Sequence, residues 1–70
     1  MTTGEIEDIE GIFQGIDLTE GPIELNAATR IIDVKAFIQA QLSIIKNAPE
    51  SRMSIPAYER LVTLKEILLA

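Results

Sequence analysis

The segment Ile31–Ile45, IIDVKAFIQAQLSII, constrains the fold of this chain more than any other. Asp33 stands at the position of a helix N-cap, where its carboxylate can accept a hydrogen bond from a free N–H of the first turn. The apolar residues that follow recur at steps of three and four, which places them on one side of an α-helix: Val34, Phe37, Ile38, Leu42 and Ile45. The pattern predicts a central helix over about 34–47, against which the rest of the chain packs.

A first helix is predicted over about 3–14. Thr2 and Glu5 form the T-x-x-E pattern of a capping box, and Gly15 follows the last turn. Its apolar residues again recur at steps of three and four: Ile6, Ile9, Phe13 and Ile16. The acidic residues of this segment fall mostly off that stripe, so we interpret them as a solvated helix face and not as a cation site: Glu7, Asp8 and Glu10.

A last helix is predicted from Ser54, as the capping residue, to the C-terminus. Pro56 suits the first turn, because the N–H that proline lacks would have no partner inside the helix there. The residues expected to face the core are Tyr58, Leu61, Leu64 and Leu68.

Residues 17–32 have the pattern of turns and short strands and not that of a helix. The segment Thr19-Glu20-Gly21-Pro22 predicts a turn, because glycine allows a positive φ and proline fixes φ. The segments 23–25 and 29–32 are short and partly β-branched, and they predict either a β-hairpin or an extended loop that inserts Ile23, Leu25 and Ile31 into the core. The expected fold class is mainly α, a single small three-helix domain over 1–70 with a short hairpin or ordered loop between helices 1 and 2.

The amino-acid composition argues against most kinds of catalytic and metal-binding site. The 70 residues include no cysteine and no histidine, so disulfides, thiolate metal sites and the commonest general base are all missing. We therefore expect neither an enzyme nor a resident cofactor or metal. The start of the chain lacks the basic residues of a signal peptide, and no apolar run reaches the roughly 18 residues of a membrane span. A cytoplasmic protein is the expectation.

The charge is unevenly distributed along the chain. Residues 1–24 hold seven of the eleven acidic residues and no basic one, and the net charge is −5. Such an acidic segment disfavours contact with phosphate backbones or with anionic lipid. Neither a nucleic acid nor a membrane is therefore the expected partner.

One polar cluster could bind a ligand. Four hydrogen-bonding residues lie within eight positions before the central helix, where a small anion or a peptide could approach a helix N-terminus: Asn26, Thr29, Arg30 and Asp33. The alternative assigns the same four to a turn, a strand, a surface base and a helix cap. That structural interpretation is the one we favour.

Two of the predicted helices carry more apolar residues than one buried stripe needs. The surplus on the central helix is Ala36, Ala40 and Ile44, and the surplus on the last helix is Val62, Ile67 and Leu69. A helix that is apolar on two sides packs on two sides or contacts another chain. We therefore predict a homodimer or larger oligomer at micromolar concentration, with these as candidate contacts: Ala40, Ile44, Val62 and Leu69.

A family resemblance accompanies these patterns. The segments LTEGPIEL (18–25) and IIDVKAFI (31–38), followed by Tyr58, Leu61 and Leu64, resemble a family of small bacterial proteins of unknown function. The resemblance implies a compact protein, and it carries no activity, cofactor or catalytic residue.

The function that these observations favour is a non-catalytic protein–protein interaction or self-association module. The alternative is a small-ligand-binding or regulatory domain that uses the segment 26–33. A deep pocket beside Arg30 would favour the alternative, and an exposed apolar surface would favour the interaction module.

Overall fold

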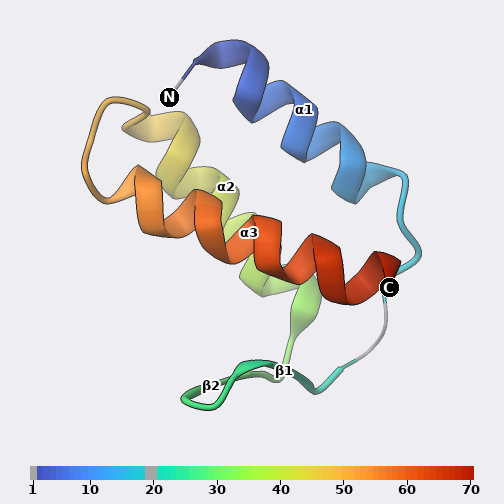
Figure 1. Cartoon of the computed structure of the whole chain (residues 1–70). Helices are drawn as coiled ribbons and strands as arrows, with labels where there is room; N and C mark the ends of the chain where they lie inside the picture. The colour runs from blue at the N-terminus through green and yellow to red at the C-terminus, as the bar shows by residue number, and fades with distance from the viewer. Residues whose placement is uncertain (1, 19–20) are drawn as a thin grey trace.

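The computed structural model describes residues 2–18 and 21–70, and in these residues it has three α-helices and one two-stranded sheet. The helices are α1 (Thr3–Gln14), α2 (Val34–Asn47) and α3 (Ser54–Leu69). The strands β1 (Ile23–Asn26) and β2 (Thr29–Ile31) lie between α1 and α2 in the chain (Figure 1). The predicted mainly helical fold is confirmed, and the hairpin is the correct interpretation of the segment between helices 1 and 2.

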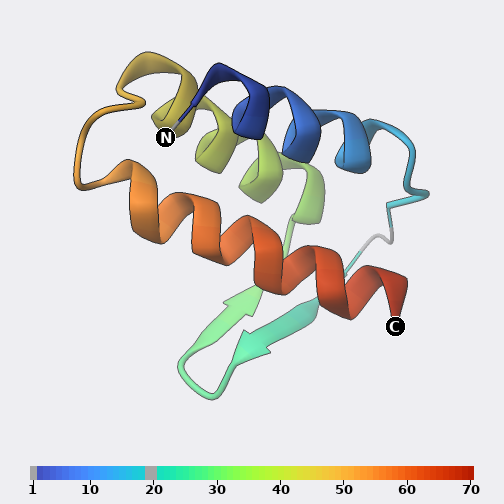
Figure 2. The same ribbon diagram turned by 45° about the horizontal axis from the view of Figure 1, so that its top comes forward.

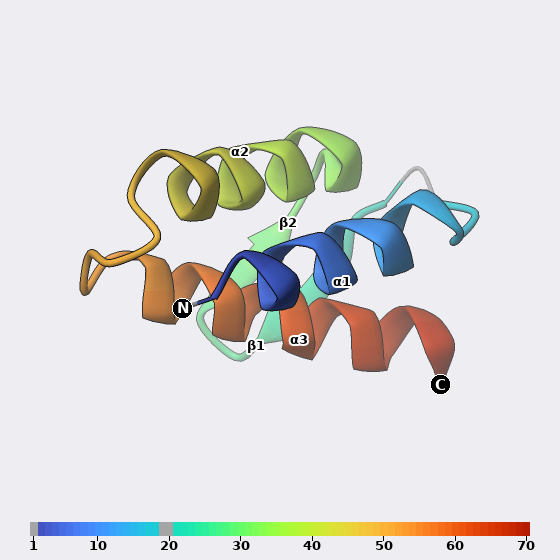
Figure 3. The same cartoon turned by 90° about the horizontal axis from the view of Figure 1, so that it is seen from above.

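The elements pack around the pair formed by α2 and α3. These two helices lie side by side, and α1 contacts both of them, as the view from above shows (Figure 3). The hairpin packs on α3 through β1 and lies at the opposite end of the molecule from α1 (Figure 2). The surface of α3 is thus shared between a side that faces the core and sides that face α1 and the hairpin.

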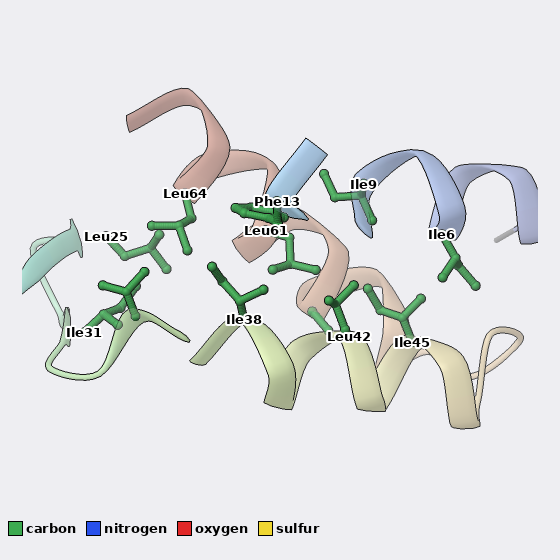
Figure 4. Close-up of a cluster of buried hydrophobic side chains, with 12 residues drawn as sticks. Ile6, Ile9, Phe13, Leu25, Ile31, Ile38, Leu42, Ile45, Leu61 and Leu64 are labelled. Carbon is green, nitrogen blue, oxygen red and sulfur yellow. The ribbon is translucent and has the colours of Figure 1, made fainter. Parts of the chain in front are cut away.

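Buried apolar side chains from all three helices and both strands form one cluster (Figure 4). Its members are Ile6, Ile9, Phe13, Leu25, Ile31, Val34, Ile38, Leu42, Ile45, Ala57, Leu61 and Leu64. Full burial of a Leu, Ile or Val side chain stabilises a fold by roughly 1.5–3 kcal/mol. The segment 31–45 supplies more of the cluster than α1 or α3 does, in line with its predicted central place.

Some core residues differ from those that the sequence predicts. Ile23, Phe37, Tyr58 and Leu68 are half-buried and pack at the edge of the cluster. Ala57 is fully buried, because it lies four residues before Leu61 and seven before Leu64 and so shares their side of α3. Helical spacing identifies the buried side of a helix, but residue size alone does not rank the positions within it.

Helix α1 begins with the predicted capping box. The Glu5 N–H donates to Thr2 Oγ1 (3.2 Å), and the Thr2 N–H donates back to Glu5 Oε1 (3.2 Å). The Thr2 hydroxyl also donates to Glu5 Oε1 (3.0 Å). The backbone bond from Thr2, followed by the bond from its hydroxyl, lowers the pKa of the Glu5 carboxyl below its ordinary value.

The hairpin is short and contains one irregularity. Ile23 lies opposite Ile31, Glu24 opposite Arg30, and Asn26 opposite Thr29, with a bulge between Glu24 and Asn26. Leu25 and Ile31 turn inward and are buried. A hairpin of this size is marginal alone, so its stability depends on these two side chains packing against the helices.

Gly21 brings the chain into the hairpin through a backbone conformation that favours glycine. Its φ is +69°, and a Cβ built on it would lie 2.7 Å from the carbonyl oxygen of Ile32. Glycine therefore allows the chain before β1 to pass close to the end of β2. The preceding part of the predicted turn, residues 19 and 20, lies outside the described residues.

The two remaining helix starts differ from each other. Asp33 caps α2 as predicted, since its Oδ1 accepts the Ala36 N–H (3.0 Å). The prediction that Ser54 caps α3 is wrong. Ser54 is buried inside the first turn, and its hydroxyl donates back to the carbonyls of Ser51 (2.7 Å) and Pro49 (3.2 Å). The Ser54 side chain therefore joins the linker to the start of α3, and it does not accept a hydrogen bond from an N–H group of the first turn.

Replacement of the α2 cap gives the first prediction. We expect Asp33→Ala to lower the free energy of unfolding by about 0.5–2 kcal/mol, because a first-turn N–H loses its acceptor. Asp33→Asn and Asp33→Ser keep an acceptor and should cost clearly less. Urea denaturation followed by circular dichroism measures all three variants, and equal effects from all three would contradict a capping role.

The capping box of α1 gives a prediction about pH. Because the folded-state pKa of Glu5 is lowered, its stabilising contribution is present above the unfolded-state value of about 4.3 and is lost as the pH falls through the folded-state pKa. In Thr2→Ala the hydroxyl bond is absent, so we expect the pKa of Glu5 to rise toward its ordinary value. Carboxyl titration by NMR measures this, and an unchanged pKa would contradict the role of the Thr2 hydroxyl.

Candidate functional site

Helix α3 carries apolar residues on a second side, away from the core. Ile55, Val62 and Leu69 follow one another at seven-residue steps, which are close to two helical turns, so all three lie on one side of the helix. We call these three residues the outer line of α3. Ile55 is 57% exposed and Leu69 is 61% exposed, whereas Val62 is half-buried against the cluster. The outer line is separate from the side that carries Ala57, Leu61 and Leu64.

A groove of about 720 Å³ runs past Ile55 and Val62 of the outer line and reaches α1, while Leu69 lies beyond its lining. We call it the α1–α3 groove. Its apolar lining comes from Ile55, Tyr58 and Val62, and its charged lining residues are all glutamates. The full set of lining residues is Glu5, Ile55, Tyr58, Glu59, Val62, Thr63 and Glu66.

The capping box connects this groove to the fold of α1. Glu5 is the residue that α1 contributes to the lining, and its carboxylate accepts the Thr2 hydrogen bonds described above. A carboxylate held by two such bonds keeps a defined place at the edge of the groove. Its lowered pKa extends the pH range in which it is charged further to the acidic side.

Two residues of the predicted ligand cluster form hydrogen bonds with backbone groups close to them in the chain. Asn26 Oδ1 accepts the Ala28 N–H (2.9 Å) and thereby closes the hairpin turn, while Asp33 caps α2. Arg30 is an exposed strand residue opposite Glu24, and Thr29 is half-buried. Asn26 also borders a depression of about 290 Å³ next to Arg60 of α3. Two of the four polar groups thus already have backbone partners, as the structural interpretation expects.

The four predicted oligomer contacts lie on two different helices. Val62 lines the α1–α3 groove, and Leu69 is exposed at the end of α3. On α2, Ala40 is exposed and Ile44 is half-buried against the cluster. The surplus on α2 and the surplus on α3 therefore belong to separate parts of the surface.

A hydrogen bond between two polar side chains joins α2 to α3, and little in the sequence indicates it. Gln41 is buried within the apolar side of α2, and Arg60 Nη1 donates to its Oε1 (3.2 Å). A buried amide requires such a partner, because an unpaired polar group inside a protein is costly. The position of Gln41 between Ile38 and Ile45 is the one hint of its burial, and its partner could not be identified without the packing.

A second groove lies between α1 and α2. It measures about 360 Å³, and its lining combines apolar residues with Glu10 and Lys35. Glu10 also forms an ion pair with Lys46 that joins the two helices. Because both signs of charge meet here, this groove has a weaker electrostatic preference than the α1–α3 groove.

Two kinds of site are absent from the part of the chain that the structure describes. In residues 2–18 and 21–70, no group of three or more acidic side chains is placed to hold a metal ion. Over the same ranges, no helix has the length and apolar character needed to cross a membrane.

Comparison with known proteins identifies the family to which the chain belongs. No curated protein and no solved structure matches the chain. The profile of one family, described as a domain of unknown function (DUF6965), matches residues 4–70. Since this match spans nearly the whole sequence, and since a family of small proteins without known function is what the sequence resembles, the chain belongs to the DUF6965 family.

Proposed function

We propose that this protein is a non-catalytic protein–protein interaction module that binds its partner on the outer side of α3. The observation that carries the proposal is the outer line of α3, which leaves Ile55 and Leu69 more than half exposed beside the α1–α3 groove. An apolar surface of this kind, surrounded by charged residues, is typical of a protein contact.

The residues of the groove suit the centre of an interface. Tyr58 and Val62 are half-buried and already held by the core, so a partner that covers them does not have to order them first. Tyrosine is also among the residues that contribute most to binding energy in interfaces. The exposed Ile55 extends the apolar area next to them.

The same observations weigh against the other functions considered. The sequence contains no histidine or cysteine, which supports a non-catalytic role. The oxygens of Asn26 and Asp33 that a ligand would use accept backbone hydrogen bonds, which disfavours a ligand site in 26–33. The absence of cysteine also supports a cytoplasmic place of action, which we include in the proposal.

Self-association is a second part of the proposal, and the exposed alanines of α2 favour it. Ala36 and Ala40 lie on a side of α2 that neither the cluster nor the α1–α3 groove uses. Small residues allow two helices to approach closely. A contact between copies through α2 leaves the outer line of α3 free for a different partner.

The proposed role of α3 is tested with one charged substitution and one matched control. Ile55→Glu places a charge on the outer line, and Ile32→Glu places it at a position that is 67% exposed and outside the α1–α3 groove. Both leave the buried cluster intact. We expect a protein that co-purifies with the wild type from native cells to be lost with Ile55→Glu and retained with Ile32→Glu.

The same comparison is then made with the purified partner. We expect Ile55→Glu to weaken binding by about tenfold or more, because a buried apolar contact is replaced by a charge that must lose its water. Calorimetry measures the affinity. Equal binding by the two variants would contradict the assignment of the surface to α3.

Self-association has a separate measurement. We expect sedimentation equilibrium to give an average mass above the 7.7 kDa of one chain as the concentration rises through the micromolar range. Ala40→Glu should return the mass to that of one chain, since Ala40 is exposed and its replacement leaves the cluster unchanged. Ile44→Glu is less suitable, because Ile44 packs on the cluster. A constant mass of 7.7 kDa would show that the predicted oligomer does not form.

A further inference from the structure

The charged residues that line the α1–α3 groove are all acidic. Glu5 enters it from α1, and Glu59 and Glu66 enter it from α3. Asp8 is exposed and follows Glu5 by three residues, so it lies on the same side of α1. The groove thus combines an apolar strip with carboxylates from two helices, on a protein whose net charge is already −5.

This charge pattern favours one class of partner over another. A second copy that docks groove to groove about a two-fold axis would present the same surface, because such an interface pairs a patch with itself. Carboxylates would then face carboxylates, and like charges across an interface oppose association. A partner that offers lysine or arginine beside apolar residues would satisfy both components of the groove.

The length of the α1–α3 groove suggests the form of the partner. Its lining on α3 runs from Ile55 to Glu66, and a helix rises about 1.5 Å per residue, so this part of the groove extends over roughly 16 Å. A partner helix of about three turns has the same length. An amphipathic helix carries its apolar residues along one side, spaced three, four and seven apart, so it can cover an apolar strip of this length while its charged residues stay at the edges.

We propose that the α1–α3 groove binds a basic amphipathic helix of another protein, whose apolar side covers Ile55, Tyr58 and Val62 and whose lysine or arginine residues face Glu59 and Glu66. This inference rests on the proposed interaction function and adds the chemistry of the partner. The carboxylates give the groove its specificity, and the apolar strip gives most of the buried area.

The inference is tested by selection from a phage library of random 16-residue peptides against the full chain. We expect the enriched peptides to carry lysine or arginine together with apolar residues at helical spacing. The most enriched peptide, labelled with a fluorophore, is then measured by fluorescence anisotropy. Its affinity should fall as salt increases, because exposed charge pairs are screened.

Charge-reversal variants locate the contact. Glu59 and Glu66 are exposed, so Glu59→Lys/Glu66→Lys leaves the fold intact, which circular dichroism verifies. We expect the double variant to bind the peptide about tenfold or more weakly. Glu7→Lys/Glu50→Lys makes the same change in net charge at exposed positions outside the groove, and it should weaken binding by less than about threefold.

Each other outcome overturns the inference. Acidic or uncharged enriched peptides, no enrichment, or equal weakening by the two double variants would show that the groove does not select a basic helix. A dimer that Ile55→Glu dissociates would assign the groove to a second copy. In all these cases the co-purification experiment with Ile55→Glu and Ile32→Glu still decides the interaction function independently.

Discussion

The packing of α2 against α3 is the contact on which the rest of this structure depends. Ile45, Leu61 and Leu64 are fully buried there, and the buried side chains of α1 and the hairpin pack onto the same cluster. A chain of 70 residues buries only about 60% of the surface that its unfolded form exposes, so this one cluster supplies most of the stabilisation. The bond from Arg60 to Gln41 adds a polar link between the same two helices.

Polar residues at the chain reversals mostly serve the backbone. Asp33 and Thr2 cap helices, Asn26 closes the hairpin turn, and Ser54 joins α3 to the linker before it. In a small domain, many backbone groups lie at element ends, where they have no partner in a helix or sheet. Two of the four side chains that look most like a ligand site in this sequence, Asn26 and Asp33, therefore hydrogen-bond to the backbone at a turn and at a helix start.

The periodicity of the sequence was sufficient to predict the three helices, because each has its apolar residues at steps of three and four and a recognisable end. It was not sufficient to decide how those helices are oriented. Ala57 is buried and the much larger Tyr58 is only half-buried, because Ala57 lies on the same side of α3 as Leu61 and Leu64 whereas Tyr58 lies at the edge of that side. The α1–α3 groove has the same origin. Val62 and Leu69 were recognisable as surplus apolar residues, but the approach of Glu5 from another helix follows only from tertiary packing.

The two apolar sides of α3 are a consequence of the size of this protein. A small domain has few helices, so a helix that contributes to the core also forms much of the surface, and α3 has Leu61 and Leu64 on its buried side and Ile55 and Val62 on the side of the groove. Val62 touches both regions, since it lines the groove and packs on the cluster. Under the proposed function we therefore expect substitutions at Val62 to change stability and binding together, and substitutions at the exposed Ile55 and Leu69 to change binding alone. On the same proposal Glu59 and Glu66 oppose the pairing of this apolar strip with the same strip of a second copy, because like charges would then meet across the contact.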